Sequence, residues 1–339
     1  MEDVRGRFVW HQLMTRDVPG AKKYYSKLVG WKTMPWPLDP AYTVCHAEAG
    51  PVAGIMEIPA EVPADVPSHW VQYIGTRDVD ATADAAVRAG GSVMKAPSDM
   101  QGAGRYAVLK DPQGALFAII DPENARPEDA GQPPLGTFSW HELYTTDHEA
   151  AFAFYSGLFG WNAMQRMDMG PNGIYLIFGQ NGVQRGGMYI PSPDKKIPPA
   201  WTPYAHVPDA DKAHALATSL GSTALFGPME VPGGSRVAGL LDPAGAAFAI
   251  HSMPAAAAAP MAEPKPMAKA KAKAKAKPKA KAAAKPAAKK KVVKKAAPRK
   301  KAAKKAAPKK KAPARKAKGK AKAKSRAKAG KKTGARRKK

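Results

Sequence analysis

The chain contains one phrase of 22 residues twice, and this repetition constrains its fold more than any other feature. "WHQLMTRDVPGAKKYYSKLVGW" occupies residues 10–31, and "WHELYTTDHEAAFAFYSGLFGW" occupies residues 140–161. The offset is 130 throughout, and 11 of the 22 positions are identical. Repetition at a fixed offset indicates a duplicated structural unit, so both copies are expected to fold in the same way.

Shorter matches extend the duplication along the chain. "GIMEIP" at 54–59 corresponds to "GGMYIP" at 186–191, "WVQYIGTRDVDA" at 70–81 to "WTPYAHVPDADK" at 201–212, and "DPQGALFAII" at 111–120 to "DPAGAAFAIH" at 242–251. The offset varies only between 130 and 132. We therefore predict a first domain at 1–121, a Pro-rich acidic linker at 122–136 and a second domain at 137–253, followed by a tail at 254–339.

Within each copy the hydrophobic pattern alternates between strand and helix. Residues 8–14 alternate as a strand, and 15–17 supply residues that begin helices. The next apolar residues have helical spacing up to Gly30, namely Ala21, Tyr24, Tyr25, Leu28 and Val29. Strands are expected near 42–47, 52–58 and 70–76, a second helix near 80–89, and two further strands around the Asp-Pro-x-Gly turn at 111–114. This pattern predicts an α+β fold with two βαβββ modules in each copy.

The tail differs from the rest of the chain in composition. Residues 254–339 contain 36 Lys and Arg and one acid, Glu263, whereas residues 1–253 contain 19 Lys and Arg and 26 Asp and Glu. A Lys/Ala/Pro sequence without aromatic residues cannot bury enough surface to fold alone, so we expect disorder. Its charge predicts sequence-independent binding of DNA, or of RNA or polyphosphate, through release of counterions. The candidate contacts are Lys289, Lys290, Lys291, Lys294, Lys295, Arg299, Lys300, Lys301, Lys309, Lys310 and Lys311.

The remaining signals concern the compartment. Cys45 is the only cysteine, so an intrachain disulfide is excluded. The first residues lack the basic and apolar regions of a signal peptide, and no apolar stretch approaches the ~20 residues that span a bilayer. We therefore expect a cytoplasmic protein without a membrane partner, associated with the nucleoid through its tail.

The duplicated motifs resemble those of the vicinal oxygen chelate superfamily, the group of glyoxalases, bleomycin-resistance proteins and extradiol dioxygenases. The resemblance covers residues 8–252 and rests on D-x-x-x-A-x-x-F/Y-Y-x-x-x-x-G-W and DPxGxxFAI, each present twice. It implies that each pair of modules forms a cup-shaped mixed sheet with a ligand inside the cup. It also implies a dimer fused into one chain, so a monomer is expected. The tail is similar to linker-histone tails.

The resemblance also implies where a metal would bind in metal-dependent relatives. One ligand stands seven residues before the Asp that begins the first helix, one on the fifth strand, and one four residues after the turn glycine. In this chain those positions hold Trp10, Val71, Ala118, Trp140, Thr202 and Ala249. Imidazole and carboxylate groups are the usual ligands of such ions, and none stands there. We therefore expect no metal and a closer similarity to the metal-less, hydroxylase-like branch.

The histidines of the repeated phrase, His11 and His141, lie one residue beyond the metal position. Because successive residues of a strand face opposite sides, they are expected to point away from the cup, toward the helix layer. There they would be structural, bonded to a backbone carbonyl or buried between helix and sheet. A one-residue bulge in this strand would reverse that orientation.

The same alternation predicts the residues inside each cup. The candidate ligand-binding residues are Trp10, Gln12, Tyr73, Trp140, Tyr144, Tyr204 and His251, and the candidate catalytic residues are Glu142 and His206. They indicate either an aromatic pocket for a small organic ligand, with Glu142 or His206 as a general base, or a filled core in which polar tips find partners. Three functions stay open: a ligand-binding module, a glyoxalase-like lyase or hydroxylase-like enzyme, and a nucleoid-associated protein with a structural body.

Overall fold

The computed structural model of the chain describes residues 3–125, 132–195 and 197–254. These residues lie in one compact unit. The candidate nucleic-acid contacts between Lys289 and Lys311 lie outside the described residues. No helix in the three described ranges is long and apolar enough to cross a membrane.

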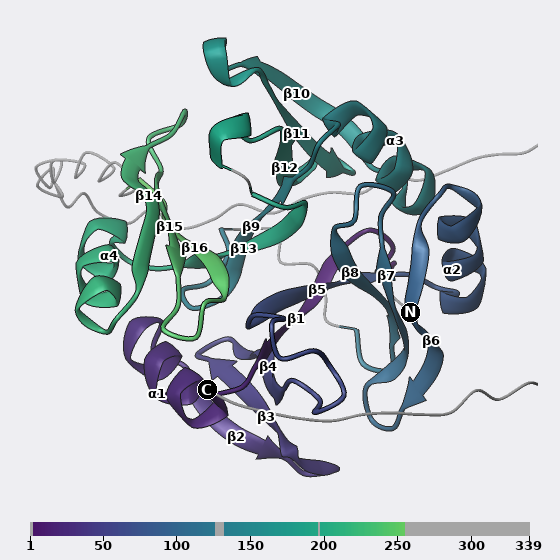
Figure 1. Ribbon diagram of the computed structural model, residues 1–339, viewed down its shortest axis with the longest axis horizontal. Helices are drawn as coiled ribbons and strands as arrows, with labels where there is room; N and C mark the ends of the chain where they lie inside the picture. The colour runs from purple at the N-terminus through teal and green to yellow at the C-terminus, as the bar shows by residue number, and fades with distance from the viewer. Residues whose placement is uncertain (1–2, 126–131, 196, 255–339) are drawn as a thin grey trace, which may run out of the picture. The chain divides into compact units, whose positions relative to one another are not determined.

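The first copy contains two βαβββ modules in succession (Figure 1). Their elements are β1 (Phe8–Thr15), α1 (Val18–Leu28), β2 (Lys32–Trp36), β3 (Asp39–Ala47) and β4 (Gly50–Glu57), then β5 (His69–Gly75), α2 (Val79–Arg88), β6 (Ser92–Met100), β7 (Gly104–Lys110) and β8 (Leu116–Pro122).

The second copy repeats this order and adds two short 3₁₀ helices, η1 (Gly170–Asn172) and η2 (Pro193–Lys195). Its main elements are β9 (Phe138–Tyr144), α3 (His148–Phe159), β10 (Asn162–Asp168), β11 (Ile174–Gln180) and β12 (Val183–Tyr189), then β13 (Ala200–His206), α4 (Ala210–Ser219), β14 (Thr223–Glu230), β15 (Arg236–Leu241) and β16 (Ala247–Ser252).

Each copy forms one mixed sheet of eight strands. The strand order is β2-β3-β4-β1-β5-β8-β7-β6 in the first and β10-β11-β12-β9-β13-β16-β15-β14 in the second. The pairs β1–β4 and β5–β8 are parallel, while β1 and β5 join the two modules in antiparallel fashion. The predicted α+β class and the duplicated, cup-forming sheets are confirmed.

Local sequence explains where the four helices begin. An aspartate precedes each helix and accepts a hydrogen bond from a backbone N–H of the first turn, which leaves fewer orphan donors. These residues are Asp17, Asp78, Asp147 and Asp209. In α3 the helix ends at Gly160, whose φ of 74° suits glycine.

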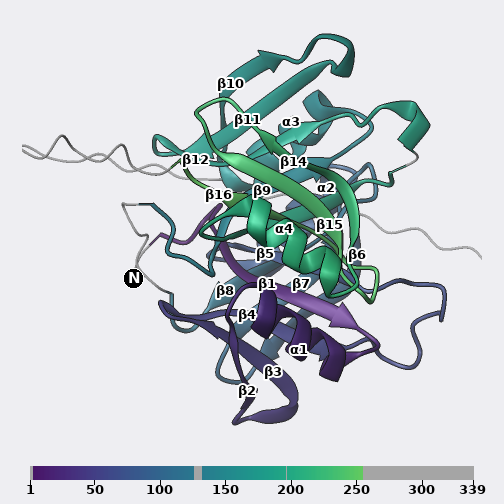
Figure 2. The ribbon, with the colours of Figure 1, turned by 90° about the vertical axis from the view of Figure 1, so that its left-hand side faces the viewer.

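The two copies pack crosswise through their helix faces. Helix α1 contacts α4, and α2 contacts α3, so each module packs against a module of the other copy (Figure 1). The second view likewise places α1 beside α4 (Figure 2). One core cluster combines Phe117 with Phe154 and Phe159, and another combines Leu28 with Phe248 and Ile250. Neither copy has an apolar core of its own on this side, so the fold depends on the pairing.

Two reciprocal hydrogen bonds fix this pairing. Tyr25 of the first repeated phrase donates its hydroxyl to Asp242 Oδ2 at 3.0 Å, and Tyr155 of the second phrase donates to Asp111 Oδ2 at 3.0 Å. Both aspartates begin the Asp-Pro-x-Gly turns, and their other oxygen accepts backbone N–H groups of the turn. The two motifs that repeat in the sequence therefore meet across the copies rather than within them.

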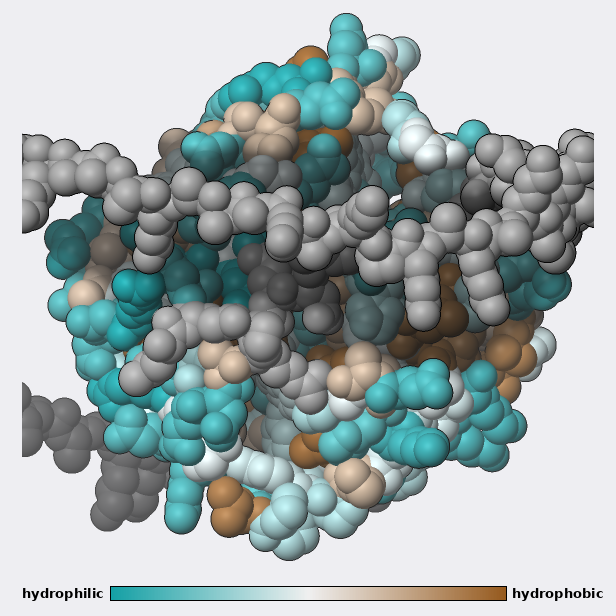
Figure 3. Space-filling view, turned by 180° about the vertical axis from the view of Figure 1, so that it is seen from behind, coloured by the Kyte–Doolittle hydropathy of each residue, from teal (hydrophilic) through white to brown (hydrophobic). Residues whose placement is uncertain are grey.

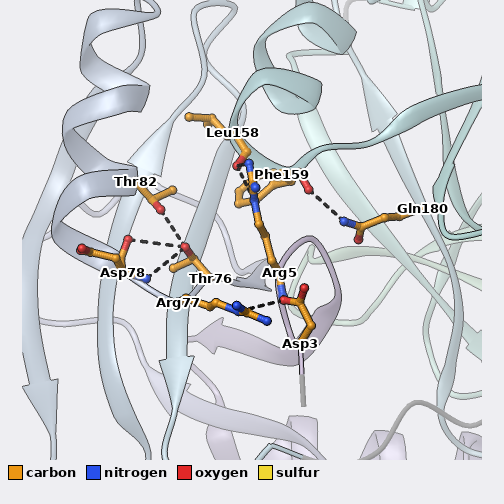
Figure 4. A network of polar contacts seen from close by, with 9 residues as sticks. All are labelled: Asp3, Arg5, Thr76, Arg77, Asp78, Thr82, Leu158, Phe159 and Gln180. Atoms are coloured by element: carbon orange, nitrogen blue, oxygen red, sulfur yellow. Dashed lines mark hydrogen bonds and ion pairs between the residues drawn. The ribbon is translucent and has the colours of Figure 1, made fainter. Parts of the chain in front are cut away.

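The segments that precede β1 and β9 cross to the opposite copy as well. Trp161 donates its indole N–H to the Gly6 carbonyl at 2.8 Å, and Trp31 donates to the Gly136 carbonyl at 2.7 Å. Beside Gly6, Arg5 donates to the Leu158 carbonyl near the end of α3 (Figure 4). These contacts tie the N-terminal segment to the second copy and the linker to the first.

Candidate functional site

Strands β1 and β9 place the first residues of each cup. A register shift between Phe8 and Trp10 interrupts the pairing of β1 with β5, and a matching shift lies between Phe138 and Trp140 in β9. The bulge precedes the tryptophans, so alternation from Trp10 onward is kept. Phe8 and Phe138 are thereby turned toward the face that carries the histidines.

His11 and His141 meet each other at the junction of the two copies. Their Nε2 atoms lie 2.8 Å apart, each ring stacks on a phenylalanine of the other copy, and His141 Nδ1 bonds to the Arg185 carbonyl at 3.0 Å. Burial lowers the pKa of His141 to about 3. The bond from His141 to a backbone carbonyl agrees with the predicted structural role. The predicted contact with the helix layer was wrong, because each histidine meets the histidine of the other copy instead.

The second cup surrounds a buried carboxylate. Tyr204 donates its hydroxyl to Glu142 Oε1 at 2.7 Å, and Tyr175 donates to Oε2 at 2.7 Å while it accepts the Trp140 indole N–H at 2.9 Å. Burial raises the pKa of Glu142, and the tyrosine hydroxyls oppose this by stabilising the charge. Tyr144 packs edge-on against Tyr189 beside this network. A carboxyl group in this position can hold or transfer a proton.

The first cup has the same frame with a neutral centre. Tyr73 donates to Gln12 Oε1 at 2.9 Å, and Trp10 donates to the Tyr42 hydroxyl at 2.8 Å. The Gln12 amide N–H points to Met14 Sδ at 2.8 Å. Val71, Ala118 and Ile120 continue this lining as part of one buried cluster. Trp10 and Tyr73 thus keep the places of Trp140 and Tyr204, whereas Met14 stands where the Tyr144 hydroxyl stabilises the Glu142 charge.

Sequence reasoning missed the tyrosines contributed by the third strand of each first module. Tyr42 and Tyr175 are 133 residues apart and occupy equivalent places in the two cups. The pairing register also corrects the alignment of "GIMEIP" with "GGMYIP". Met56 pairs with Met14 and Tyr189 pairs with Tyr144, so the structural offset there is 133 rather than 132. An alignment of the two copies that matched the sheet face of each strand residue, as well as residue identity, would have found this offset.

His206 and His251 lie together in a separate polar group. His206 Nδ1 bonds to the Pro133 carbonyl at 2.7 Å, and His251 Nδ1 bonds to Ser139 Oγ at 2.7 Å. The rings are 6.0 Å apart, and burial lowers the pKa of His251 to about 4. The structure therefore places His206 with the linker rather than with Glu142, and it adds Ser139, which the sequence analysis did not consider.

A cavity of about 1420 Å³ opens between the copies. Its lining includes the first tryptophan of each repeated phrase and the centres of both cups, namely Trp10, Gln12, Tyr73, Trp140, Glu142 and Tyr204. In the space-filling view, hydrophobic residues lie deep in a hollow of this face (Figure 3). Cys45 lies outside the lining, and burial raises the pKa of its thiol to about 12, which disfavours a nucleophilic thiolate.

The positions that hold a metal in related folds do not fit one here. Trp10, Val71 and Ala118 in the first cup, and Trp140, Thr202 and Ala249 in the second, offer no imidazole or carboxylate. Across the part of the chain that the structure describes, no three His, Cys, Asp or Glu side chains gather as a metal site. Glu142 is engaged by tyrosines instead.

Comparison with known proteins identifies the family. Residues 7–119 match the Glyoxalase/Bleomycin resistance protein/Dioxygenase superfamily. The protein named "Putative glyoxylase CFP32" of Mycobacterium tuberculosis is 32% identical over 244 residues, which cover 71% of this chain and 92% of that protein. The chain belongs to this superfamily, as its repeated motifs suggested.

Further similarities concern a biosynthetic protein and two solved structures. The anthracycline biosynthesis protein DauV of a Streptomyces species is 30% identical over 263 residues, covering 72% of this chain and 92% of DauV. A Mn(II)-bound glyoxalase from Novosphingobium aromaticivorans aligns with a TM-score of 0.54 at 16% identity, over 73% of this chain and 82% of that one. The 2,3-dioxygenase LapB of a Pseudomonas species aligns with a TM-score of 0.52 at 12% identity, over 74% of this chain and 93% of LapB. The structural likenesses establish the fold alone.

Proposed function

We propose that the protein binds a small organic ligand in its second cup and does so without a metal ion. The observation that carries this proposal is the Glu142 carboxylate, held by Tyr175 and Tyr204 beside the cavity. Burying a carboxylate costs free energy. The first cup avoids this cost because it has the neutral amide of Gln12 at the same place, so a carboxylate is not needed to build the cup. A polar centre within aromatic walls is the usual design of a ligand site.

An aromatic ligand is supported by the walls and by one group of relatives. Tryptophan and tyrosine rings stack on planar molecules, and two Streptomyces relatives are named for anthracycline biosynthesis. The test is a titration of the full chain with a hydroxyanthraquinone, followed by quenching of tryptophan fluorescence. We expect saturable quenching that Glu142→Gln weakens on the order of tenfold, the cost of one hydrogen bond to a charged group.

The matched control is Glu149→Gln, the same chemical change at an exposed site on α3. Glu149 forms an ion pair with Arg166 and lies outside the cavity lining. Equal weakening by both variants would refute ligand binding in the second cup, and absence of saturable quenching by any planar aromatic probe would refute an aromatic ligand.

Metal independence has its own measurement. We expect elemental analysis of the purified protein to find far less than one divalent ion per chain and EDTA to leave ligand binding unchanged. One tightly bound ion per chain would show that ligands other than the six family positions hold a metal.

Catalysis is a second candidate function, favoured by the raised pKa of Glu142. Its carboxylate would act as the general base of a glyoxalase-like lyase or a hydroxylase-like enzyme. Turnover lost in Glu142→Gln, with a pH profile that follows this group, would support the enzyme. Because His206 is bonded to the linker carbonyl, we expect His206→Ala to affect turnover less.

The basic tail is proposed to bind DNA without sequence preference and to place the protein at the nucleoid. The support is its 36 Lys and Arg against one acid. Affinity should fall steeply with salt and disappear when residues 254–339 are removed. Equal DNA binding by the truncated protein would refute the proposal. Ligand binding by that truncated protein would argue against a body with a purely structural role.

A further inference from the structure

The two cups of this chain differ in charge and in the chemistry of their walls. In the first cup the central amide of Gln12 has Met14 and Met56 as neighbours. In the second cup a carboxylate replaces the amide, and Tyr144 and Tyr189 replace the two methionines. The change to an anion and the change to aromatic walls therefore occur together, at the same place and in one copy only.

Within the described residues, no basic side chain pairs with Glu142 to neutralise its charge. The hydroxyls that stabilise its charge, those of Tyr144, Tyr175 and Tyr204, are neutral. Among the ion pairs formed within residues 3–125, 132–195 and 197–254, none joins Glu142 to a Lys or Arg. Glu142 is only 6% exposed, so water screens the charge poorly. A carboxylate in this setting attracts a cation from solution.

The aromatic rings around the carboxylate form the rest of a cation site. Tyr189 packs against Tyr144 at 5.2 Å and against Tyr175 at 5.8 Å between ring centroids, and Trp140 is held to Tyr175 through its indole N–H. Trp140, Tyr175 and Tyr189 all line the cavity. Aromatic faces attract ammonium groups, most strongly where water is excluded.

We propose that the second cup selects ligands that carry a positively charged nitrogen, with a methylated or quaternary ammonium as the best match. This inference rests on the proposed function and specifies its ligand class. Both oxygens of Glu142 already accept a tyrosine hydroxyl at 2.7 Å. The cup therefore offers charge and ring faces more than open hydrogen-bond acceptors, which favours a cation without N–H groups.

The test compares choline with its neutral isostere 3,3-dimethylbutan-1-ol, using the full-length protein. Binding is followed by ¹H–¹⁵N NMR of the tryptophan indole groups, with the Trp140 signal assigned through Trp140→Phe. We expect choline to bind on the order of tenfold more tightly than the neutral alcohol. Glu142→Gln should abolish this preference, and the exposed control Glu149→Gln should keep it.

A second variant tests the proposal independently, in case Glu142→Gln does not fold. Tyr189→Leu leaves the carboxylate in place and removes one ring, so we expect weaker choline binding with little change for the alcohol. Equal affinity of wild type for both probes would overturn the cation proposal. So would a preference that survives in Glu142→Gln.

The outcome also separates the two proposals. If hydroxyanthraquinone binds but choline does not, the cation class is wrong and ligand binding stands. If choline binds with the expected preference and hydroxyanthraquinone does not, the cation class is supported and the aromatic ligand is wrong. If no probe of either kind binds, both proposals fail.

Discussion

The reciprocal tyrosine–aspartate bonds between the copies lead to a quantitative prediction for Tyr155→Phe. The Tyr155 hydroxyl donates to buried Asp111 at 3.0 Å and accepts the Trp201 indole N–H at 2.9 Å. Loss of a hydrogen bond to a charged group costs about 1.5–3 kcal/mol, and the orphaned indole N–H adds to this. We expect the free energy of unfolding to fall by about 2–4 kcal/mol at pH 7.

The cost of Tyr155→Phe should depend on pH. Burial raises the pKa of Asp111 above its usual value of 3.8, and the Tyr155 hydroxyl partly lowers it again. Without the hydroxyl the folded-state pKa of Asp111 rises further, so the variant has a larger penalty when the carboxyl is ionised. The difference from wild type is therefore largest at neutral pH and shrinks as pH falls through the folded pKa of Asp111.

Urea unfolding monitored by tryptophan fluorescence at pH 7 and near pH 4 measures both quantities. Tyr25→Phe, the equivalent change at Asp242, should give a similar cost and a similar pH dependence. Tyr73→Phe is the control, because its hydroxyl donates to the neutral Gln12 amide. It should cost about 1 kcal/mol at either pH. A cost of Tyr155→Phe below about 0.5 kcal/mol, or one that is independent of pH, would refute the reasoning.

Two further predictions concern the pair His11 and His141, and the glycines that lie against the tyrosines of each cup. Because burial lowers the pKa of His141 to about 3, its folded state resists protonation. Stability of the wild type should therefore fall as pH drops from about 6.5 toward 3, and urea unfolding of His141→Gln should show a shallower fall over that range. A Cβ at Gly187 would overlap the Tyr175 ring, as one at Gly54 would overlap Tyr42. In the fluorescence titration Gly187→Ala should weaken ligand binding in the second cup more than Gly54→Ala does; equal effects would place the ligand elsewhere.

Much of the fold followed from local sequence. The duplication is visible directly as a phrase repeated 130 residues later. The helix starts at aspartate and the alternation along each strand depend on neighbours within a few residues. For the same reason the alternation placed Trp10, Gln12, Glu142 and Tyr204 correctly on the cup side. It failed to find Tyr42 and Tyr175, because their importance depends on pairing with distant strands.

The contacts between the copies were decided by tertiary structure alone. Tyr25 has two chemically identical partners in the sequence, Asp111 and Asp242, and local pattern cannot choose between them. The crosswise packing of α1 on α4 selects Asp242. The same packing brings His11 to His141 and leaves His206 with the linker. The sequence thus determined the modules and the face of each strand residue, whereas the chain's non-local packing determined which modules meet and which polar groups share a site.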